Sequence, residues 1–477
     1  MARVVIIGAG FAGHTAALYL NAKLGKEHQV TVVNRYDYFG FVPSWVWVGV
    51  GRMHPKHTTI PLKSVYDKRG IGFVHGSVTE IHPDENYVSV SRQGRGGIER
   101  LDYDYLLIAT GPKLNFEATP GLGPHGGYST SICTLDHTLE ARESYLEHVR
   151  RMQKGERFRF VIGTGHPAAT CQGAALEYIA NIHKDLVKRK LRDRADLVYL
   201  SNEPELGDFG VGGLYGRFRG RMMTSEEFIS AVYKHYGITS FVQRGVHKVD
   251  AKKIYWEDYD GKYGETSYDF SMLIPQFTGQ PMKYIGRNGE DVSEKVVMPN
   301  GLIKVDAIYG LDYETLCKRP EAWPATYQNP SYANIFAAGI SFAPPGPISK
   351  PHITPNGTSI SAAPPRTGMI AGVIGRLTAL NIADLINGGT LQHRERMTEM
   401  FAACVASMGD SLWDGEAAAI FMYPVVPDYN HYPNSKGRDP NITHMEMGTS
   451  GAWMKRMVHE TFMHKFRGRP GWQIIPE

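Results

Sequence analysis

The chain has 477 residues, of which 42% are hydrophobic and 21% charged, and its formal net charge is only +4. This length is too great for one core of ordinary size and predicts about three lobes. The net charge is too small to indicate a nucleic-acid partner, and we expect none. The sequence pI near 8.6 is compatible with attraction to an anionic membrane surface.

We expect no membrane-spanning helix, because no run of about 20 apolar residues lacks charge. We expect no signal peptide either, since a buried strand is predicted from Val4 onward. The four cysteines, Cys133, Cys171, Cys317 and Cys404, lie far apart. Their spacing indicates neither a metal site nor a small disulfide scaffold, and buried core positions are the ordinary explanation for each of them.

The chain opens with a pattern typical of dinucleotide binding. Residues 3–7 are apolar and rich in β-branched side chains, which predicts a buried parallel strand. The sequence GAGFAG follows at 8–13 and precedes a predicted helix at 14–24. The first glycine is expected to make the turn, the second to admit a pyrophosphate and the third to let the helix pack on the strand. The binding residues expected here are Gly8, Gly10, Phe11, Ala12 and Gly13.

The end of the next predicted strand departs from this pattern. Asn34 and Arg35 follow residues 29–33, at the place where an acid usually binds the ribose hydroxyls. Asn34 can still hydrogen-bond a ribose, and Arg35 would suit a 2′-phosphate. Two later segments favour FAD: YDYLLIATG at 103–111 and NIFAAG at 334–339 resemble the second and third FAD signatures of two-dinucleotide-binding-domain flavoproteins. The further contacts expected are Ala109, Thr110, Gly111, Gly339 and Val78.

The chain then repeats its own plan. Residues 158–162 predict another strand, and GTGHPA at 163–168 predicts a second glycine turn. A helix to about residue 190 and a strand at 197–200 are expected to follow. We therefore expect an α/β fold with two Rossmann-type domains, the second inserted in the first. The expected parts are the FAD-binding domain at 1–149 and 286–385, the second domain at 150–285, and a C-terminal membrane-associating helical region at 386–477.

The second glycine turn differs from a working NAD(P)H site. His166 and Pro167 are bulkier and stiffer than the motif prefers, and the following strand ends in Ser201 and Asn202, without an acid for a ribose. Cys171 falls in the early turns of the helix that would hold the pyrophosphate. We therefore expect that electrons do not arrive from NADH, with an unusual but working NADH site as the alternative.

Over nearly its whole length the chain resembles the sulfide:quinone oxidoreductases. The specific part of the resemblance is the context of three cysteines: SICT at 131–134, CQGA at 171–174 and CVASMGD at 404–410. Other matching segments are DYFGFVPS at 37–44 and PRTGM at 365–369. Generic flavoprotein reductases lack this cysteine triplet.

The resemblance implies a redox mechanism. Cys171 and Cys404 would form a disulfide that sulfide opens, leaving a persulfide on one sulfur and a thiolate on the other, with FAD passing two electrons to membrane quinone. The helix N-terminus beside Cys171 would lower its thiol pKa, so the reactive sulfurs are expected to be thiolates near neutral pH. Cys133 corresponds to a cysteine that holds the flavin covalently in some members. Cys317 corresponds to nothing in the family.

Other matches are weaker. His137 corresponds to a histidine thought to assist proton handling, and Glu177 to an acid near the sulfide site, although a core histidine and an ordinary helical glutamate are the alternatives. Arg366 stands where the family usually has a lysine near the flavin pyrimidine, and Thr367 follows it as a further expected contact. Asp208 replaces a histidine found in some members, which argues against a two-histidine proton relay.

The C-terminal segment at 452–466 predicts an interfacial helix, with a helix packed on the core as the alternative. Its apolar residues fall on one side and basic residues flank them. The apolar set is Trp453, Met454, Met457, Val458, Phe462 and Phe466, and the basic set is Lys455, Arg456, His459, His464, Lys465, Arg467 and Arg469. Residues 421–432 are expected to line the quinone entrance, and the proline-rich segment at 344–365 has no assigned role.

We therefore expect a peripheral membrane enzyme that takes sulfide and quinone, contacts the bilayer surface and forms a homo-oligomer. Three alternatives stay open: a single-subunit NADH:quinone oxidoreductase, a flavocytochrome-type sulfide dehydrogenase with a haem subunit, and a non-catalytic flavin-bearing sensor. The cysteines and the altered second glycine turn argue against the NADH:quinone oxidoreductase. The basic amphipathic tail argues against the flavocytochrome-type sulfide dehydrogenase.

Overall fold

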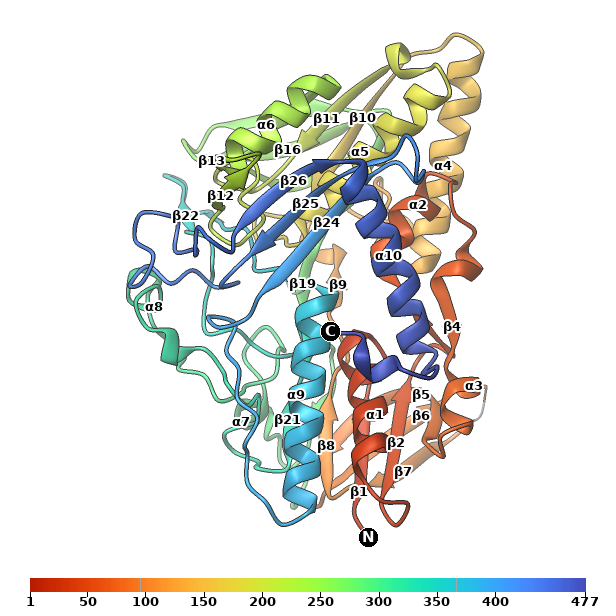
Figure 1. Ribbon diagram of the computed structural model, residues 1–477, viewed down its shortest axis with the longest axis vertical. Helices are drawn as coiled ribbons and strands as arrows, with labels where there is room; N and C mark the ends of the chain where they lie inside the picture. Colours follow the sequence, from red (N-terminus) through yellow and green to blue (C-terminus); the bar gives the residue numbers. More distant parts are fainter. Residues whose placement is uncertain (95, 366) are drawn as a thin grey trace.

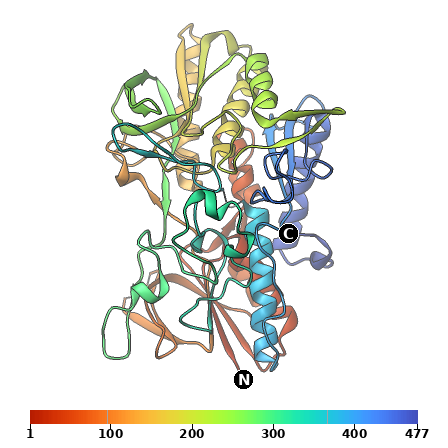
Figure 2. The same cartoon turned by 90° about the vertical axis from the view of Figure 1, so that its left-hand side faces the viewer.

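The computed structural model describes residues 1–94, 96–365 and 367–477. Two sheets of the α/β type lie one above the other in Figure 1, with β1, β2 and β8 in the lower one and β10 and β11 in the upper one. Figure 2 shows the C-terminal residues, in blue, along one side of the molecule at the junction of the two.

The lower sheet is built around the first glycine motif and has the strand order β21-β8-β1-β2-β5-β6-β7, with β20 paired to β5. The central strand β1 pairs in parallel with both β2 and β8, and its apolar residues are buried as expected of a strand covered on both faces. The edge strand β21 brings the chain back to this sheet after the second sheet is complete. The strands are β1 (Arg3–Ile7), β2 (Gln29–Asn34), β5 (Gly72–His82), β6 (Tyr87–Arg92), β7 (Ile98–Asp102), β8 (Tyr105–Ile108), β20 (Lys283–Tyr284) and β21 (Ile335–Ala337).

The upper sheet repeats the parallel arrangement in the order β14-β11-β10-β18. A small antiparallel sheet, β15-β16-β17, stands beside it. These strands are β10 (Phe158–Thr164), β11 (Ala195–Leu200), β14 (Ile238–Phe241), β15 (Arg244–Val249), β16 (Lys253–Asp258), β17 (Tyr263–Ser267) and β18 (Phe270–Ile274).

The C-terminal residues form an antiparallel sheet that the sequence analysis did not foresee. The strands β24 (Ala402–Met408), β25 (Glu416–Met422) and β26 (His444–Gly448) pair in sequence order, and the hairpin of β12 (Tyr215–Phe218) and β13 (Arg221–Thr224) extends the sheet from a distant part of the chain. The expected terminal helix is present as α10 (Thr449–Phe466), and it contacts all three C-terminal strands.

The helices cover these sheets, and α1 and α9 run side by side in the lower half of Figure 1. The longer helices are α1 (Phe11–Lys23), α4 (Leu135–Gln153), α5 (Gln172–Lys188), α6 (Ser225–Tyr236), α9 (Gly368–Ile386) and α10. The short ones are α2 (Trp45–Gly49), α3 (Leu62–Asp67), α7 (Ser293–Val296) and α8 (Tyr313–Leu316), and the remaining short strands are β3 (Tyr38–Gly40), β4 (Thr59–Pro61), β9 (Lys113–Asn115), β19 (Gln276–Thr278), β22 (His352–Ile353) and β23 (Ser359–Ile360).

Within the described part of the chain, α9 is the one helix long and apolar enough to cross a membrane by length and composition, which the sequence analysis did not expect. In this structure 61% of its most apolar window is buried. The helix packs along α1, so its apolar character is accounted for by its place in the core.

Candidate functional site

The first glycine motif has the geometry of an open dinucleotide cradle. A Cβ atom added at Gly8 would lie 2.3 Å from Ala109 O, and one at Gly13 would lie 2.0 Å from Gly8 O, so both positions require the absence of a side chain. At Gly10, by contrast, an added Cβ would meet no described atom within 4 Å. Gly10 also precedes the first residue of α1. The strand, turn and helix therefore leave open space where a pyrophosphate would approach a helix N-terminus.

Asn34 organises this loop from the end of β2. Its Oδ1 accepts a hydrogen bond from the Ala9 N–H at 3.0 Å, and its Nδ2 donates to Tyr36 O at 2.8 Å. The expected ribose contact therefore competes with a bond that shapes the glycine turn itself. Arg35 is exposed with its guanidinium over the Tyr36 ring, and Val78 lies on β5 beyond the part that pairs with β2.

The remaining expected cofactor contacts converge near the same loop. The Ala109 N–H donates to Ile7 O at 2.8 Å, which sets residues 109–111 directly beside Gly8. A Cβ at Gly339 would lie 3.1 Å from the Ala12 Cβ, so the turn after β21 reaches α1 as well. Thr110 and Gly111 follow Ala109 at the end of β8.

The N-terminus of α9 contributes an unsatisfied polar atom to this region. Thr367 precedes the first residue of α9, and its Oγ1 is buried without a hydrogen-bond partner among the described residues. A buried hydroxyl of this kind usually has a partner. The open space at Gly10 and the orphaned Thr367 hydroxyl thus fit a dinucleotide cofactor. Arg366, expected beside the flavin, lies outside the described residues.

The second glycine turn is filled by the protein's own side chains. A Cβ at Gly165 would lie 2.5 Å from Leu122 Cδ1, whereas the corresponding Gly10 is open. The Asn202 side chain donates to Pro167 O at 2.9 Å and to Ala169 O at 3.1 Å, and it accepts from Gln172 Nε2 at 3.0 Å. The expectation of a disabled nucleotide site therefore has a physical basis.

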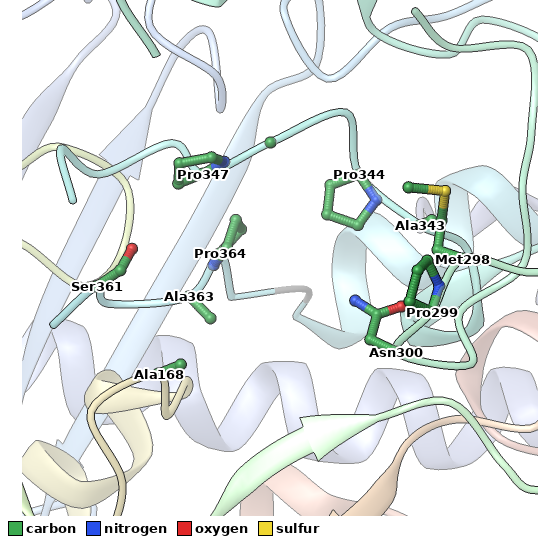
Figure 3. Close-up of a pocket in the computed structure, with 11 residues that line it drawn as sticks. Ala168, Met298, Pro299, Asn300, Ala343, Pro344, Pro347, Ser361, Ala363 and Pro364 are labelled. Carbon is green, nitrogen blue, oxygen red and sulfur yellow. The ribbon is translucent and has the colours of Figure 1, made fainter. Parts of the chain in front are cut away.

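The proline-rich segment at 344–365 covers the same turn. Ser361 N–H donates to Pro167 O, and Ala363 N–H to Ala169 O, both at 3.0 Å. An adjoining cavity has a volume of about 370 Å³. Figure 3 shows its lining by Ala168, the 298–300 turn and the prolines of this segment. None of its described lining residues carries a charge. The segment to which the sequence analysis gave no role thus helps to close the second nucleotide site.

Two of the expected redox cysteines lie near the N-terminus of α5. Cys171 is the N-cap residue of α5 and has a left-handed backbone conformation, with φ of 62°, which is uncommon for a residue with a side chain. A Cβ added at Gly173, two residues further on, would lie 3.9 Å from Cys404 Sγ of β24. All four cysteines are present as thiols and not as disulfides.

Side chains from three helices satisfy the outer edge of β24, which is the last strand of its sheet. An edge strand presents unpaired N–H and C=O groups that need partners. The bonds here are Ala403 N–H to Met369 Sδ, Lys455 Nζ to Val405 O, Ser407 N–H to Glu177 Oε1, Asn181 Nδ2 to Ser407 O and Gly409 N–H to Asn181 Oδ1. Cys404 is thereby held in a rigid position between α5 and α10.

Glu177 belongs to this edge and does not project freely into a sulfide site. It is 7% exposed and forms an ion pair with Lys455 of α10, with Oε1 and Nζ 2.9 Å apart. The structure places Glu177 near Cys404 and gives it a partner that the sequence analysis had assigned to the lipid surface.

The expectation of thiolates near neutral pH is wrong for Cys404. Burial and then the Glu177 charge raise the pKa of the Cys404 thiol to about 11, against a lowering by Lys455. Burial likewise raises the pKa of Cys133 to about 11, against a lowering by its hydrogen bond with Ser131. The buried positions of these thiols oppose ionisation, because a charge is poorly solvated there.

Cys133 and His137 lie at the start of α4. The Thr134 side chain caps this helix by accepting from the His137 N–H at 3.2 Å. The His137 ring packs between Phe116 and His125, with centroid distances of 5.7 and 5.5 Å, and its Nδ1 is buried with no partner among the described residues. Burial and then the neighbouring His125 lower the pKa of His137, which favours the neutral ring.

Asp208 is buried in the loop after β11, close to a second acid that the sequence analysis missed. Glu203 accepts from Tyr199 OH, Ser201 Oγ and the Phe209 N–H, each at 2.7 Å. Burial and then the Asp208 charge raise the pKa of Glu203 to about 7, and burial raises the pKa of Asp208 to about 6. Glu203 could have been noticed as the acid nearest the end of β11, but it faces the protein interior.

The basic and apolar faces of α10 differ from those expected. Lys455, His459, Lys465 and Phe466 are buried, so the expectation that they face lipid is wrong. The outward face carries Trp453 and Met457, which are 56% and 59% exposed. The reason is that α10 closes the fold: Lys465 pairs with Glu477, and Phe466 packs against the Phe11 and Phe39 rings.

Comparisons with known proteins agree with this arrangement. Residues 2–192 match the model of the pyridine nucleotide-disulphide oxidoreductase family. Sulfide-quinone reductase of Aquifex aeolicus is 28% identical over 464 residues, covering 97% of this chain and 91% of that protein. The X-ray structure of the sulfide:quinone oxidoreductase from Aquifex aeolicus superposes with a TM-score of 0.75 at 26% identity, over 98% of this chain and 92% of that one.

A third neighbour shares the fold alone. NDH2 of Plasmodium falciparum in complex with NADH has a TM-score of 0.66 at 13% identity, covering 99% of this chain and 97% of that one. The architecture is thus shared with a protein solved in complex with NADH, so the fold alone does not identify the electron donor of this chain.

Proposed function

We propose that the chain is a sulfide:quinone oxidoreductase, which oxidises sulfide to sulfur or polysulfide and reduces a membrane quinone. The observation that carries the proposal is the position of Cys404 beside the first turn of α5, the helix whose N-cap residue is Cys171. Two cysteines near the start of one helix and an open dinucleotide cradle are the parts that a flavin-coupled thiol–disulfide oxidation of sulfide requires.

The proposed chemistry starts from a Cys171–Cys404 disulfide. Hydrosulfide attacks one cysteine sulfur, so a new S–S bond forms while the disulfide bond breaks and the other cysteine leaves as a thiolate. Atoms and charge balance, and the products are one persulfide and one thiolate. The Lys455–Glu177 pair and the edge bonds of β24 fix Cys404 during this exchange.

We infer that the cofactor is FAD, held by the glycine loop at 8–13, residues 109–111, Gly339 and Thr367. Re-forming the disulfide from the persulfide and the thiolate releases the outer sulfur, one proton and two electrons. FAD, when bound, would supply the two-electron acceptor for this step and the donor to quinone. The cradle at Gly10 would receive the pyrophosphate on the N-terminus of α1. Cys133 is proposed as a point of covalent attachment for the flavin, and His137 as a proton carrier.

NADH is not the proposed donor. Leu122 and Asn202 occupy the second glycine turn, and residues 361–363 bond across it. A nicotinamide dinucleotide would have to displace these contacts before its phosphates could reach the helix N-terminus. A single-subunit NADH:quinone oxidoreductase is therefore the weaker alternative for this chain.

We propose that the protein attaches to the membrane through an apolar surface patch formed by Leu412, Trp413, Trp453 and Met457. Their side chains are 44%, 89%, 56% and 59% exposed. Trp453 Nε1 donates to Leu412 O, which ties the loop between β24 and β25 to α10. Exposed tryptophans on a surface of this kind suit the interface of a bilayer, from which quinone is drawn.

The decisive experiment is anaerobic reduction of the purified flavoprotein. We expect sulfide to bleach the flavin absorbance and an equal concentration of NADH to leave it unchanged, with a short-chain quinone then restoring the oxidised spectrum. Bleaching by NADH but not by sulfide would contradict the proposal. A cytochrome that restores the spectrum where quinone does not would instead favour a flavocytochrome-type partner.

A further inference from the structure

Lys455 points from α10 into the fold. Its Nζ lies 2.9 and 3.1 Å from the two carboxylate oxygens of Glu177 and 3.0 Å from Val405 O, and its side chain is buried with 5% exposure. Lys455 and Glu177 are 278 residues apart in the sequence. The ion pair therefore joins the last long helix to α5, the helix that begins beside Cys171.

Both members of the pair lie close to Cys404. Val405, which accepts a bond from Lys455, is the next residue of β24, and Ser407 of the same strand donates its N–H to Glu177. Charges this close to a buried thiol act strongly, because the surrounding protein screens them less than water does. The carboxylate opposes formation of a thiolate at Cys404 and the ammonium favours it.

We propose that Lys455 is a positioning residue of the redox site, which neutralises Glu177 beside Cys404 and so reduces the cost of forming a thiolate at Cys404. This inference rests on the proposed function, because it gives the role to a cysteine assigned there to sulfide oxidation. A buried carboxylate without this partner would leave an uncompensated negative charge near the reacting sulfur. Lys455 thus serves the interior of the enzyme, while Trp453 and Met457 of the same helix face outward.

A second lysine on α10 shows what a purely structural ion pair looks like. Lys465 is also buried, pairs with Glu477 at 2.7 Å and donates to Ile475 O at 2.7 Å. Its bonds lie among the C-terminal residues, and no described bond joins it to β24. Lys465 therefore provides a matched control for the loss of a buried lysine from the same helix.

The test measures the ionisation of Cys404 directly. In the full-length chain with the other three cysteines replaced by serine, the rate of alkylation of Cys404 by iodoacetamide is followed against pH, since the thiolate is the species that reacts. The variants are Lys455→Met, Lys455→Arg, Glu177→Gln and Lys465→Met, each checked by circular dichroism. The double variant Glu177→Gln with Lys455→Met removes both charges of the ion pair, so neither is left unpaired. It replaces a single variant that does not fold.

Loss of Lys455 and loss of Glu177 should shift the pKa of Cys404 in opposite directions. Lys455→Met should slow alkylation at fixed pH about tenfold, equivalent to a rise of about one pKa unit, and Glu177→Gln should accelerate it by a similar factor. Lys455→Arg should restore the parent rate to within about threefold, and Lys465→Met should leave it unchanged. The double variant should fall between the two single variants.

Shifts of the same sign in Lys455→Met and Glu177→Gln, or no shift in either, would overturn the inference, as would an equal effect of Lys465→Met. The alkylation assay uses neither sulfide nor quinone. Its result is therefore separate from the bleaching experiment: opposite shifts with no bleaching by sulfide would remove the proposed function alone, and bleaching without opposite shifts would remove the role of Lys455 alone.

Discussion

The imidazole of His14 bonds the backbone of Phe466, with Nε2 and the carbonyl oxygen 2.8 Å apart. A carbonyl only accepts, so Nε2 carries the proton, and Nδ1 accepts from Tyr66 OH at 2.7 Å. Burial lowers the pKa of His14 to about 4, which keeps the ring neutral. Because His14 lies on α1, directly after the glycine loop, this bond fastens the C-terminal helix to the helix that would bind the cofactor.

Replacing Phe466 should therefore destabilise the domain that contains the glycine loop as well as the C-terminal helix. We expect Phe466→Ala to lower the free energy of unfolding by about 3–5 kcal/mol, because it empties a buried site lined by Phe11, Phe39 and Phe462. Chemical denaturation followed by tryptophan fluorescence measures the change. Met457→Ala, on the exposed face of α10, should stay within about 0.5 kcal/mol of the parent, and an equal loss in both variants would contradict the packing described.

The glycines of the first motif should separate cofactor binding from folding. Gly10→Ala places a methyl group in open space, so the chain should fold with a nearly unchanged melting temperature but lose most of its flavin. Gly13→Ala drives its Cβ to 2.0 Å from Gly8 O and should lower the melting temperature of the cofactor-free protein. Flavin content and differential scanning fluorimetry measure the two effects. Full flavin occupancy in Gly10→Ala would show that the pyrophosphate does not approach this residue.

The cysteine pair should be needed for sulfide chemistry and not for cofactor binding. Cys171→Ser and Cys404→Ser should each abolish sulfide-dependent bleaching while the flavin absorbance of the purified protein remains, because neither thiol alone can form the disulfide that sulfide attacks. Cys317→Ser is the matched control and should bleach like the parent. Parent-like bleaching in Cys171→Ser or Cys404→Ser would remove the proposed mechanism.

The buried acids Glu203 and Asp208 should make stability depend on pH. Their pKa values are raised in the folded protein, to about 7 and about 6, so their contribution is fully present below the unfolded value near 4 and is lost as pH rises through 6 and 7. The charged and titratable groups around Asp208 are Glu203, Glu205, Lys436, Tyr259, Tyr429 and Arg438.

Asp208→Asn should therefore stabilise the protein at pH 8 by about 1–3 kcal/mol relative to its effect at pH 4, since the amide oxygen can still accept the Gly210 N–H. Denaturant titrations at pH 4, 6 and 8 measure the difference. The exposed Asp260→Asn should leave the pH profile unchanged, and a profile in Asp208→Asn that parallels the parent's would refute the assignment.

The apolar surface patch should decide membrane attachment. Trp413→Ser combined with Trp453→Ser should reduce co-sedimentation with anionic vesicles, because it removes two exposed aromatic side chains from the patch. Tyr263→Ser, at an exposed aromatic residue on β17, is the control and should bind like the parent. Parent-like binding of the double variant would place the lipid-contacting surface elsewhere.

Local sequence was sufficient to identify the cofactor cradle and the strands around it. Strand, glycine turn and helix are neighbours in the chain, so the roles of Gly8, Gly10 and Gly13 follow from spacing alone, and the structure gives each the expected close approach or open space. The altered second turn was visible for the same reason, in His166, Pro167 and Asn202.

Only the tertiary structure decided what each end of the chain contacts. Helical spacing assigned Lys455 and Lys465 to a lipid-facing edge, but spacing cannot tell which face of a helix meets a sheet and which meets solvent. Their partners Glu177 and Glu477 settle the matter, because burying a lysine is tolerated only where an acid neutralises it. Likewise Leu122 fills the second glycine turn from outside the motif, and β12 and β13 complete a sheet with strands from the far end of the chain. Such contacts depend on how distant segments pack, and no local pattern encodes them.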